Sequence, residues 1–102
     1  MSQEKYLIHC NDGEDNLEGA TISFLFATTA AKRCETVVLL VAGASQLCIK
    51  GGADGLVAEG MEPLSDLIDQ YIGHGGKLWL CPVGAKIRGI TEDDLIMNTE
   101  FG

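Results

Sequence analysis

The sequence has few cationic side chains, and this shortage excludes two large classes of partner. Seven Lys and Arg residues stand against 15 Asp and Glu residues, which gives a formal net charge of -8. Nucleic-acid phosphates are bound by clustered Lys and Arg side chains, and anionic membrane surfaces attract polybasic segments. The sequence contains no such cluster, so we expect neither nucleic acid nor a membrane as a partner.

Long apolar stretches are also missing. The longest apolar runs are much shorter than a membrane span, and residues 1–5 do not have the pattern of a signal peptide. These absences predict a cytoplasmic protein. With 46% hydrophobic residues in 102, the chain is long enough for a single domain over residues 1–102 with its own core.

The cysteines form no C-x-x-C pair. Cys10, Cys34, Cys48 and Cys81 are widely spaced, which excludes a thioredoxin motif and a zinc ribbon. We therefore expect no metal and no cofactor. A reducing compartment keeps such residues as thiols, and the ordinary role of Cys34 and Cys48 is that of small buried hydrophobic residues.

One cysteine lies where a strand is expected to run into a short helix. Residues 77–89 read as an apolar strand that ends at Cys81, followed by Pro82 at the first helical position and by Gly89 as a left-handed C-terminal cap. The first N–H groups of a helix have no intrahelical partner, so they favour a thiolate over a thiol. Cys81 is therefore the candidate nucleophile.

Several groups around Cys81 are expected to stabilise a negative charge on its sulfur. Lys86 and Arg88 follow within two turns, and Pro82 and Val83 form the start of the helix. The alternative interpretation is that Cys81 is merely a packed residue beneath this loop.

The hydrophobic patterns predict alternating strands and helices. Strands are expected at residues 5–10, 36–42 and 78–81, and helices at 17–31, at 63–72, after Cys81 and over residues 95–96. The middle strand is apolar without alternation, as in parallel strands covered by helices on both faces. The pattern indicates an α/β fold, a three-layer sandwich around a mostly parallel sheet.

Parallel strands place their C-terminal ends at one edge of the sheet, where such folds bind ligands. Cys10 and Cys81 both end strands, so they share this edge if the first strand lies beside the third. Cys48 is expected near them and Cys34 at the opposite edge. His9 is expected to face a helix layer as a structural histidine, with a Cys–His nucleophile pair as the alternative.

Glycines are concentrated between the second strand and the next helix. Residues 51–60 contain four glycines, among them Gly51, Gly52 and Gly55, but neither the Walker pattern nor the dinucleotide fingerprint. We expect a mobile loop here rather than a phosphate site.

Together these motifs resemble the DsrE/DsrF-like family. The resemblance rests on the Asp-Gly turn after the first strand, an Ala-Thr-Ile-Ser-Phe helix, a Lys-Gly segment, Glu-Gly-x-x-Pro-Leu, and Cys-x-x-x-Ala-Lys-x-Arg-Gly-Ile-x-x-x-Asp-Leu-Ile. It implies a small α/β sandwich that assembles into homo-oligomers, as trimers or hexamers or as a dimer. It also implies a cytosolic sulfur carrier or sulfurtransferase that passes sulfane sulfur through a cysteine persulfide, with sulfur donor and acceptor proteins as partners.

The resemblance also bears on single positions. Cys81 matches the first cysteine of the family's Cys-x-x-Cys form, and Gly84 stands in place of the second, which implies a carrier with one thiol and Cys10 as a possible resolving thiol. Compared with the family, the chain ends at residues 98–102, before the final strand and helix. Either the sequence is truncated or a partner copy completes the sheet, and we expect the partner.

Two other functions remain open. A small-molecule-binding module would use the glycine-rich loop and the acidic strand edge without turnover. An interaction subunit would use only its assembled surface.

Overall fold

A four-stranded parallel sheet organises the chain. The computed structural model describes residues 5–102, in which β1 (Lys5–Cys10), β2 (Glu35–Leu40), β3 (Lys77–Leu80) and β4 (Thr99–Phe101) form one sheet. The strand order is β1-β2-β3-β4, and each neighbouring pair is parallel. The three expected strands are confirmed to within two residues. A fourth strand that was not expected from the sequence, β4, pairs with β3.

Among residues 5–102, three α-helices and three 3-10 helices connect the strands. The α-helices are α1 (Leu17–Ala31), α2 (Leu64–Gly73) and α3 (Pro82–Ile87), and the 3-10 helices are η1 (Glu14–Asn16), η2 (Ala42–Cys48) and η3 (Glu92–Asp94). The Asn16 side chain caps α1 by accepting the Gly19 N–H. A capping box between Thr91 and Asp94 starts η3. The helix expected over residues 95–96 is not formed, because Leu95 is extended and pairs with Ile49.

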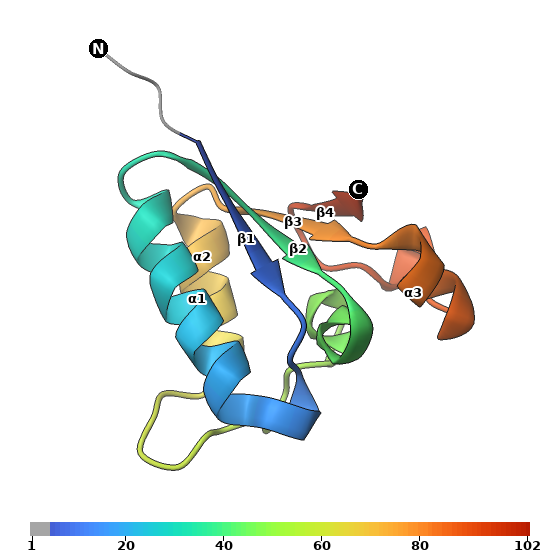
Figure 1. The fold of residues 1–102 in the computed structure, drawn as a ribbon, viewed down its shortest axis with the longest axis horizontal. Coiled ribbons are helices and arrows are strands. Elements are labelled where there is room, and N and C mark those ends of the chain that lie inside the picture. Colours follow the sequence, from blue (N-terminus) through green and yellow to red (C-terminus); the bar gives the residue numbers. More distant parts are fainter. Residues whose placement is uncertain (1–4) are drawn as a thin grey trace.

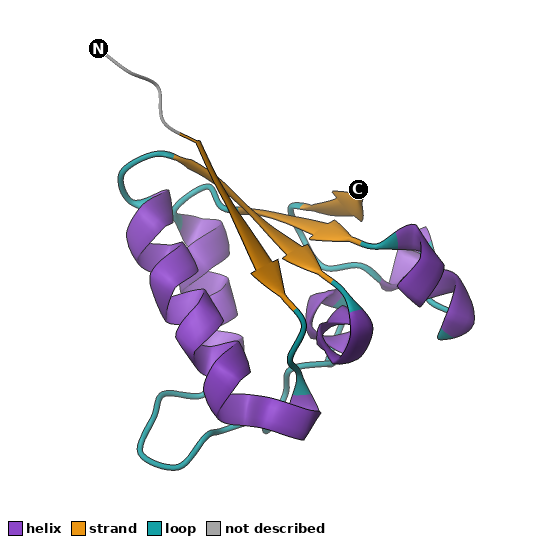
Figure 2. Ribbon diagram, viewed as in Figure 1, coloured by secondary structure: helices purple, strands orange, loops and turns teal. Residues whose placement is uncertain are grey.

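Both long helices lie on the same face of the sheet, while η2 and α3 lie at its C-terminal edge (Figures 1 and 2). The reason is the strand order, which never reverses. Right-handed crossovers that all step in one direction put their helices on one side. The condition that β1 lies beside β3 is not met, because β2 lies between them. The expected α/β fold around a parallel sheet is confirmed. The described residues place both long helices on one face of this sheet.

The face under α1 and α2 holds the core. Every second residue of the central strands is buried there, from Val38 and Leu40 to Leu78 and Leu80. The Tyr71 hydroxyl, on α2, contacts the carbonyl oxygens of Thr36 at 3.0 Å and Lys77 at 2.6 Å. Burial raises the pKa of Tyr71, so the hydroxyl keeps its proton. The hydroxyl thereby links α2 to the first residues of β2 and β3.

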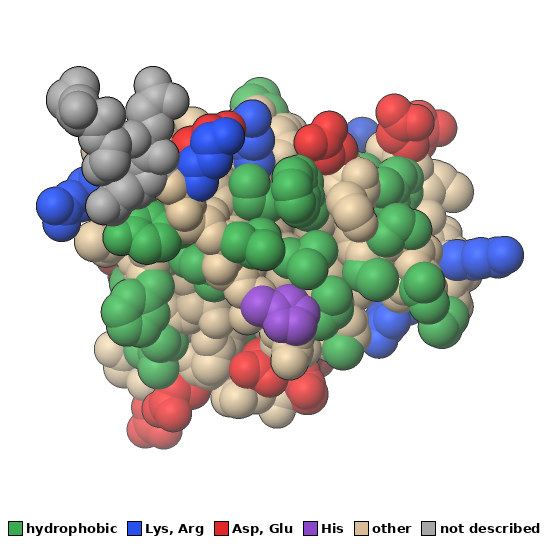
Figure 3. All heavy atoms as spheres, turned by 45° about the horizontal axis from the view of Figure 1, so that its top comes forward, with side chains coloured by type: hydrophobic (Ala, Val, Ile, Leu, Met, Phe, Trp, Pro, Cys, Tyr) green, Lys and Arg blue, Asp and Glu red, His purple; other side chains and the backbone are tan. Residues whose placement is uncertain are grey.

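The other face of the sheet is not covered by a helix of the described chain. We call it the open face. The residues that alternate with the buried set lie on it, in the rows Leu7–Val37–Lys77 and His9–Leu39–Trp79–Glu100. Leu7 is 62% exposed, and hydrophobic side chains form a band across this side of the molecule (Figure 3).

Replacing Tyr71 with Phe tests the tie between α2 and the strands. Tyr71→Phe keeps the ring, which packs edge-on against Phe24 at 5.8 Å, and removes the hydroxyl. We expect a loss of about 1–2 kcal/mol in the free energy of unfolding, because two buried carbonyl contacts lose their donor. Urea unfolding followed by circular dichroism measures this change. An unchanged midpoint with an unchanged slope contradicts it.

Candidate functional site

The ladder of the sheet continues one residue past the strand ends and fixes the positions of two cysteines. Val41 N–H donates to Cys10 O, and Cys81 N–H donates to Leu40 O, both at 3.1 Å. Cys10 and Cys81 therefore both lie at the C-terminal edge, as expected. They are not neighbours, because β2 runs between them.

Cys81 lies at the junction predicted from the sequence. It is the N-cap of α3, Pro82 follows in the first helical turn, and Gly89 adopts a φ of +68° directly after the helix. The Cys81 residue is half-buried at the edge of the sheet. Its thiol makes no capping hydrogen bond to the described backbone.

The positive side chains near Cys81 are exposed. Arg88 Nη1 donates to the carbonyl oxygen of Gly84 at 3.3 Å, so its guanidinium folds back along α3 toward the turn that follows Cys81. Lys86 projects from the same short helix into solvent. Val83 is 67% exposed and does not cover the approach to the junction.

Two other cysteines are buried. Cys10 Sγ lies 3.4 Å from Asp12 O, and Cys48 Sγ lies 3.3 Å from Ser45 O. Burial raises the pKa of the Cys10 thiol, and it raises that of Cys48 to about 12. Both residues therefore remain neutral thiols at physiological pH.

The remaining auxiliary candidates lie away from Cys81. His9 is exposed on the open face, and the expectation that it faces a helix layer is wrong because the helices cover only the other side. Cys34 directly precedes β2, which confirms its place at the opposite edge. No hydrogen bond joins His9 to a cysteine among the described residues.

The glycine-rich segment leads from η2 to α2. Gly51 and Gly55 have a φ of +78°, a left-handed conformation that favours glycine. Gly52 lies against the carbonyl oxygen of Gln46, where a side chain has no room. These glycines allow the chain to turn tightly after η2. The expected mobility of this loop stays a prediction.

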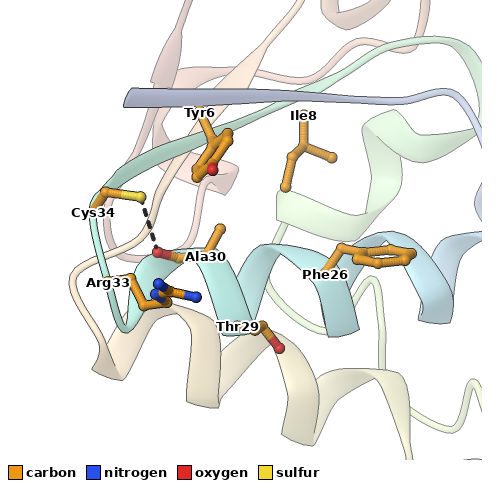
Figure 4. A pocket seen from close by; sticks show the side chains of 7 residues that line it. All are labelled: Tyr6, Ile8, Phe26, Thr29, Ala30, Arg33 and Cys34. Carbon is orange, nitrogen blue, oxygen red and sulfur yellow. Dashed lines mark hydrogen bonds between the residues drawn. The ribbon is translucent and has the colours of Figure 1, made fainter. Parts of the chain in front are cut away.

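A hollow in the described part of the chain lies at the other end of the sheet. It has a volume of about 480 Å³ and is lined by Tyr6, Ile8, Phe26, Arg33 and Cys34, between β1 and α1 (Figure 4). It is therefore remote from the Cys81 junction, and we place the candidate chemistry at the junction because Cys81 is the half-buried thiol at the start of a helix. Among residues 5–102, no group of three His, Cys, Asp or Glu side chains is arranged to hold a metal ion.

Sequence reasoning missed Ser45. This residue of η2 is fully buried, and none of the described residues gives its hydroxyl a hydrogen-bond partner. It lies against Gly84, three residues after Cys81. A single serine in an apolar segment carries no sequence signal for such a position.

Comparisons with known proteins agree with this geometry. The sequence model of the DsrE/DsrF-like family matches residues 4–102. The chain is 34% identical over 85 residues to the uncharacterized protein MJ0760 of Methanocaldococcus jannaschii, covering 81% of this chain but only 30% of that protein. The crystal structure of the ychN protein from E. coli is similar in fold, with a TM-score of 0.63 at 13% identity over 100% of this chain and 85% of the other. No helix in the described part of the chain has the length and apolarity to cross a membrane.

The four thiols should differ in reactivity according to their burial. With iodoacetamide at pH 7 to 9, we expect Cys81 and Cys34 to be alkylated at least about tenfold faster than Cys10 and Cys48, because buried thiols with raised pKa form little thiolate. Peptide mass spectrometry over time gives the four rates. Rapid labelling of Cys48 in the folded protein contradicts the placement of these residues.

Proposed function

Because the chain belongs to the DsrE/DsrF-like family, a sulfur-relay-type family, we propose that it carries sulfane sulfur as a persulfide on Cys81. The observation that supports this role most directly is the position of Cys81. It is a half-buried thiol at the C-terminal edge of a parallel sheet, at the start of α3. The other cysteines are buried or lie at the opposite edge.

The proposed transfer needs one thiol and no external oxidant. The Cys81 thiolate attacks the outer sulfur of a donor persulfide, R–S–SH, so that a bond forms to Cys81 Sγ and the donor's S–S bond breaks. The donor leaves as a thiolate and is protonated to R–SH. An acceptor thiolate then attacks the outer sulfur, takes it as its own persulfide, and releases the Cys81 thiolate.

A carrier with one thiol agrees with the surroundings of Cys81. Gly84 occupies the place of a second cysteine on α3, and Cys10 is separated by β2 and buried beside α1. Val83 and Gly84 supply N–H groups in the first turn of α3, and Arg88 adds a positive charge. These groups favour an anionic sulfur, and the acceptor must be a thiol of another molecule.

We also propose that two copies of the chain associate through their open faces. Apolar residues of β1, β2 and β3 are left half-exposed there, and charges of both signs surround them, with Glu35 bound to Lys5 at 3.5 Å and to Lys77 at 3.4 Å. A two-fold axis along the strands sets β1 of one copy over β4 of the other. His9 of one copy then faces the acidic Glu100 of the other. This arrangement places no two side chains of the same charge directly opposite each other.

A small-molecule-binding role is the second candidate, favoured by the hollow between β1 and α1. Its lining combines aromatic side chains with the Arg33 guanidinium, a composition that suits an apolar anion. Ligand stabilisation that persists in Cys81→Ser distinguishes this role from sulfur transfer.

Intact mass spectrometry tests the sulfur carrier. After incubation with inorganic polysulfide and removal of the excess, we expect the wild type to gain the mass of one sulfur atom and to lose it on reduction. Cys81→Ser should gain none, because Cys34, the other half-buried thiol, directly precedes a strand and lacks the N–H groups of a helix start that favour an anionic sulfur. Cys34→Ser is the matched control, since it removes another half-buried thiol and should still be loaded. Equal loading of Cys81→Ser and the wild type would rule out Cys81 as the carrier.

Light scattering tests the open-face dimer. Leu39→Glu puts a charge in the middle of the apolar row, so we expect at least about a tenfold weaker dimer, because a buried unpaired charge is costly. Phe26→Glu, on the outer surface of α1 where Phe26 is 69% exposed, is the matched control and should leave the dimer intact. A monomeric wild type, or dissociation by Phe26→Glu alone, contradicts this arrangement.

A further inference from the structure

The hollow between β1 and α1 has walls from both elements. Tyr6 and Ile8 point toward α1, because the even-numbered residues of β1 face the helix layer and the odd-numbered ones lie on the open face. Phe26 and Ala30 of α1 line the opposite wall (Figure 4). The enclosed volume of about 480 Å³ lies within the range of small-molecule sites.

The α1 wall has an apolar end and a charged end. Phe26, Ala30 and Arg33 are spaced by four and three residues, so they lie on one side of the helix and of the turn that follows it. Phe26 is 69% exposed, whereas Phe24 is fully buried on the core side. Because a helix rises about 1.5 Å per residue, the backbones of Phe26 and Arg33 are about 10 Å apart.

The charged end offers a cation that is not paired. The Thr29 hydroxyl donates to Leu25 O at 3.0 Å, so it is already satisfied. The Cys34 thiol likewise contacts Ala30 O at 3.4 Å. The Arg33 guanidinium, in contrast, makes no ion pair or side-chain hydrogen bond with any residue that the structure describes. Arg33 can therefore bind an anion from outside the chain.

This hollow suits an anion although the chain as a whole repels anions. The formal net charge is -8, but the described residues that line the hollow include no acidic one. Glu35, the acidic residue closest to Arg33 in the sequence, is paired with Lys5 and Lys77. The end of α1 carries a partial negative charge, but Ala30 O is bound by the Arg33 N–H at 3.0 Å, and the full charge of the guanidinium is larger. One guanidinium in an acidic protein favours a head group with a single negative charge.

We propose that this hollow binds a linear alkyl carboxylate, with the carboxylate on the Arg33 guanidinium and the chain between Tyr6 and Phe26. The planar guanidinium matches a carboxylate through two parallel hydrogen bonds, and methylene groups buried against the apolar walls add to the affinity. The proposal rests on the small-molecule role, the second candidate function, and names its class of ligand. It does not depend on sulfur transfer at Cys81.

Cys34 reports whether the hollow is occupied, because its half-buried thiol lies in the wall beside Arg33. The experiment adds octanoate at neutral pH, below its micellar concentration, and measures the rates at which iodoacetamide alkylates Cys34 and Cys81 in the same sample. Peptide mass spectrometry gives both rates. Octanol has the same chain without the charge, and hexanoate has the same charge on a shorter chain. The rate of each protein without additive is its reference.

We expect millimolar octanoate to slow the alkylation of Cys34 at least about threefold and to leave Cys81, at the other edge of the sheet, unchanged. Octanol at the same concentration should slow Cys34 less than about 1.5-fold, because it leaves the guanidinium unpaired. Hexanoate should need an about fourfold higher concentration for the same protection, because it buries two fewer methylene groups.

Three variants test the two ends of the site. Arg33→Gln should raise the octanoate concentration for half-protection about five- to tenfold, because the charged hydrogen bonds are lost. Lys32→Gln is the matched control, since it removes a charge from the neighbouring exposed position, which does not line the hollow, and should change this concentration less than about twofold. Phe26→Ala should raise it about three- to fivefold, and the fold should be retained because this ring is exposed.

Distinct results overturn the proposal in different ways. Equal slowing of Cys34 and Cys81, or equal effects of Arg33→Gln and Lys32→Gln, shows an effect that is not specific to the hollow. Protection by octanol as strong as that by octanoate removes the role of Arg33, while the small-molecule role stands. If none of the three compounds protects Cys34, the small-molecule role fails as well. The sulfur carrier is independent of these results, and Cys81→Ser should show the same protection of Cys34.

Discussion

The parallel strand order β1-β2-β3-β4 is the constraint on which the rest of the structure depends. Because the order never reverses, right-handed crossovers put α1 and α2 on one face and leave the other face open. Because the strands are parallel, all their C-terminal ends meet at one edge, and the ladder extends past β3 through the hydrogen bond from Cys81 N–H to Leu40 O. The backbone of the candidate nucleophile is therefore held by the sheet itself, while its side chain remains at the accessible edge.

At this edge, chemistry depends on short-range contacts between segments that are distant in sequence. η2 follows β2, α3 follows β3, and the parallel pairing of these two strands brings Ser45 against Gly84. Gly84 lets α3 approach η2 closely, because a Cβ atom at this position would come within 3.1 Å of Ser45 Oγ.

Local signals made the Cys81 junction predictable. Pro82 and Gly89 mark the ends of a short helix, and the apolar run before Cys81 marks a strand, so the N-cap position followed from sequence alone. The strand order could not be predicted in this way, because it depends on non-local pairing. The place of His9 depended on that order and was wrong with it. β4 has only three residues, Thr99–Phe101, with no apolar pattern to reveal it. Ser45 was missed because its significance arises only from its contact with Gly84.

The central claim is that Cys81 holds one sulfane sulfur per chain, and cold cyanolysis measures this most directly. Cyanide removes the outer sulfur of a persulfide as thiocyanate and regenerates the thiol. For protein loaded with inorganic polysulfide, the account predicts one thiocyanate per chain, with a free Cys81 thiol recovered afterwards. Thiocyanate released in equal amount from the Cys81→Ser protein, or none from the wild type, contradicts the account.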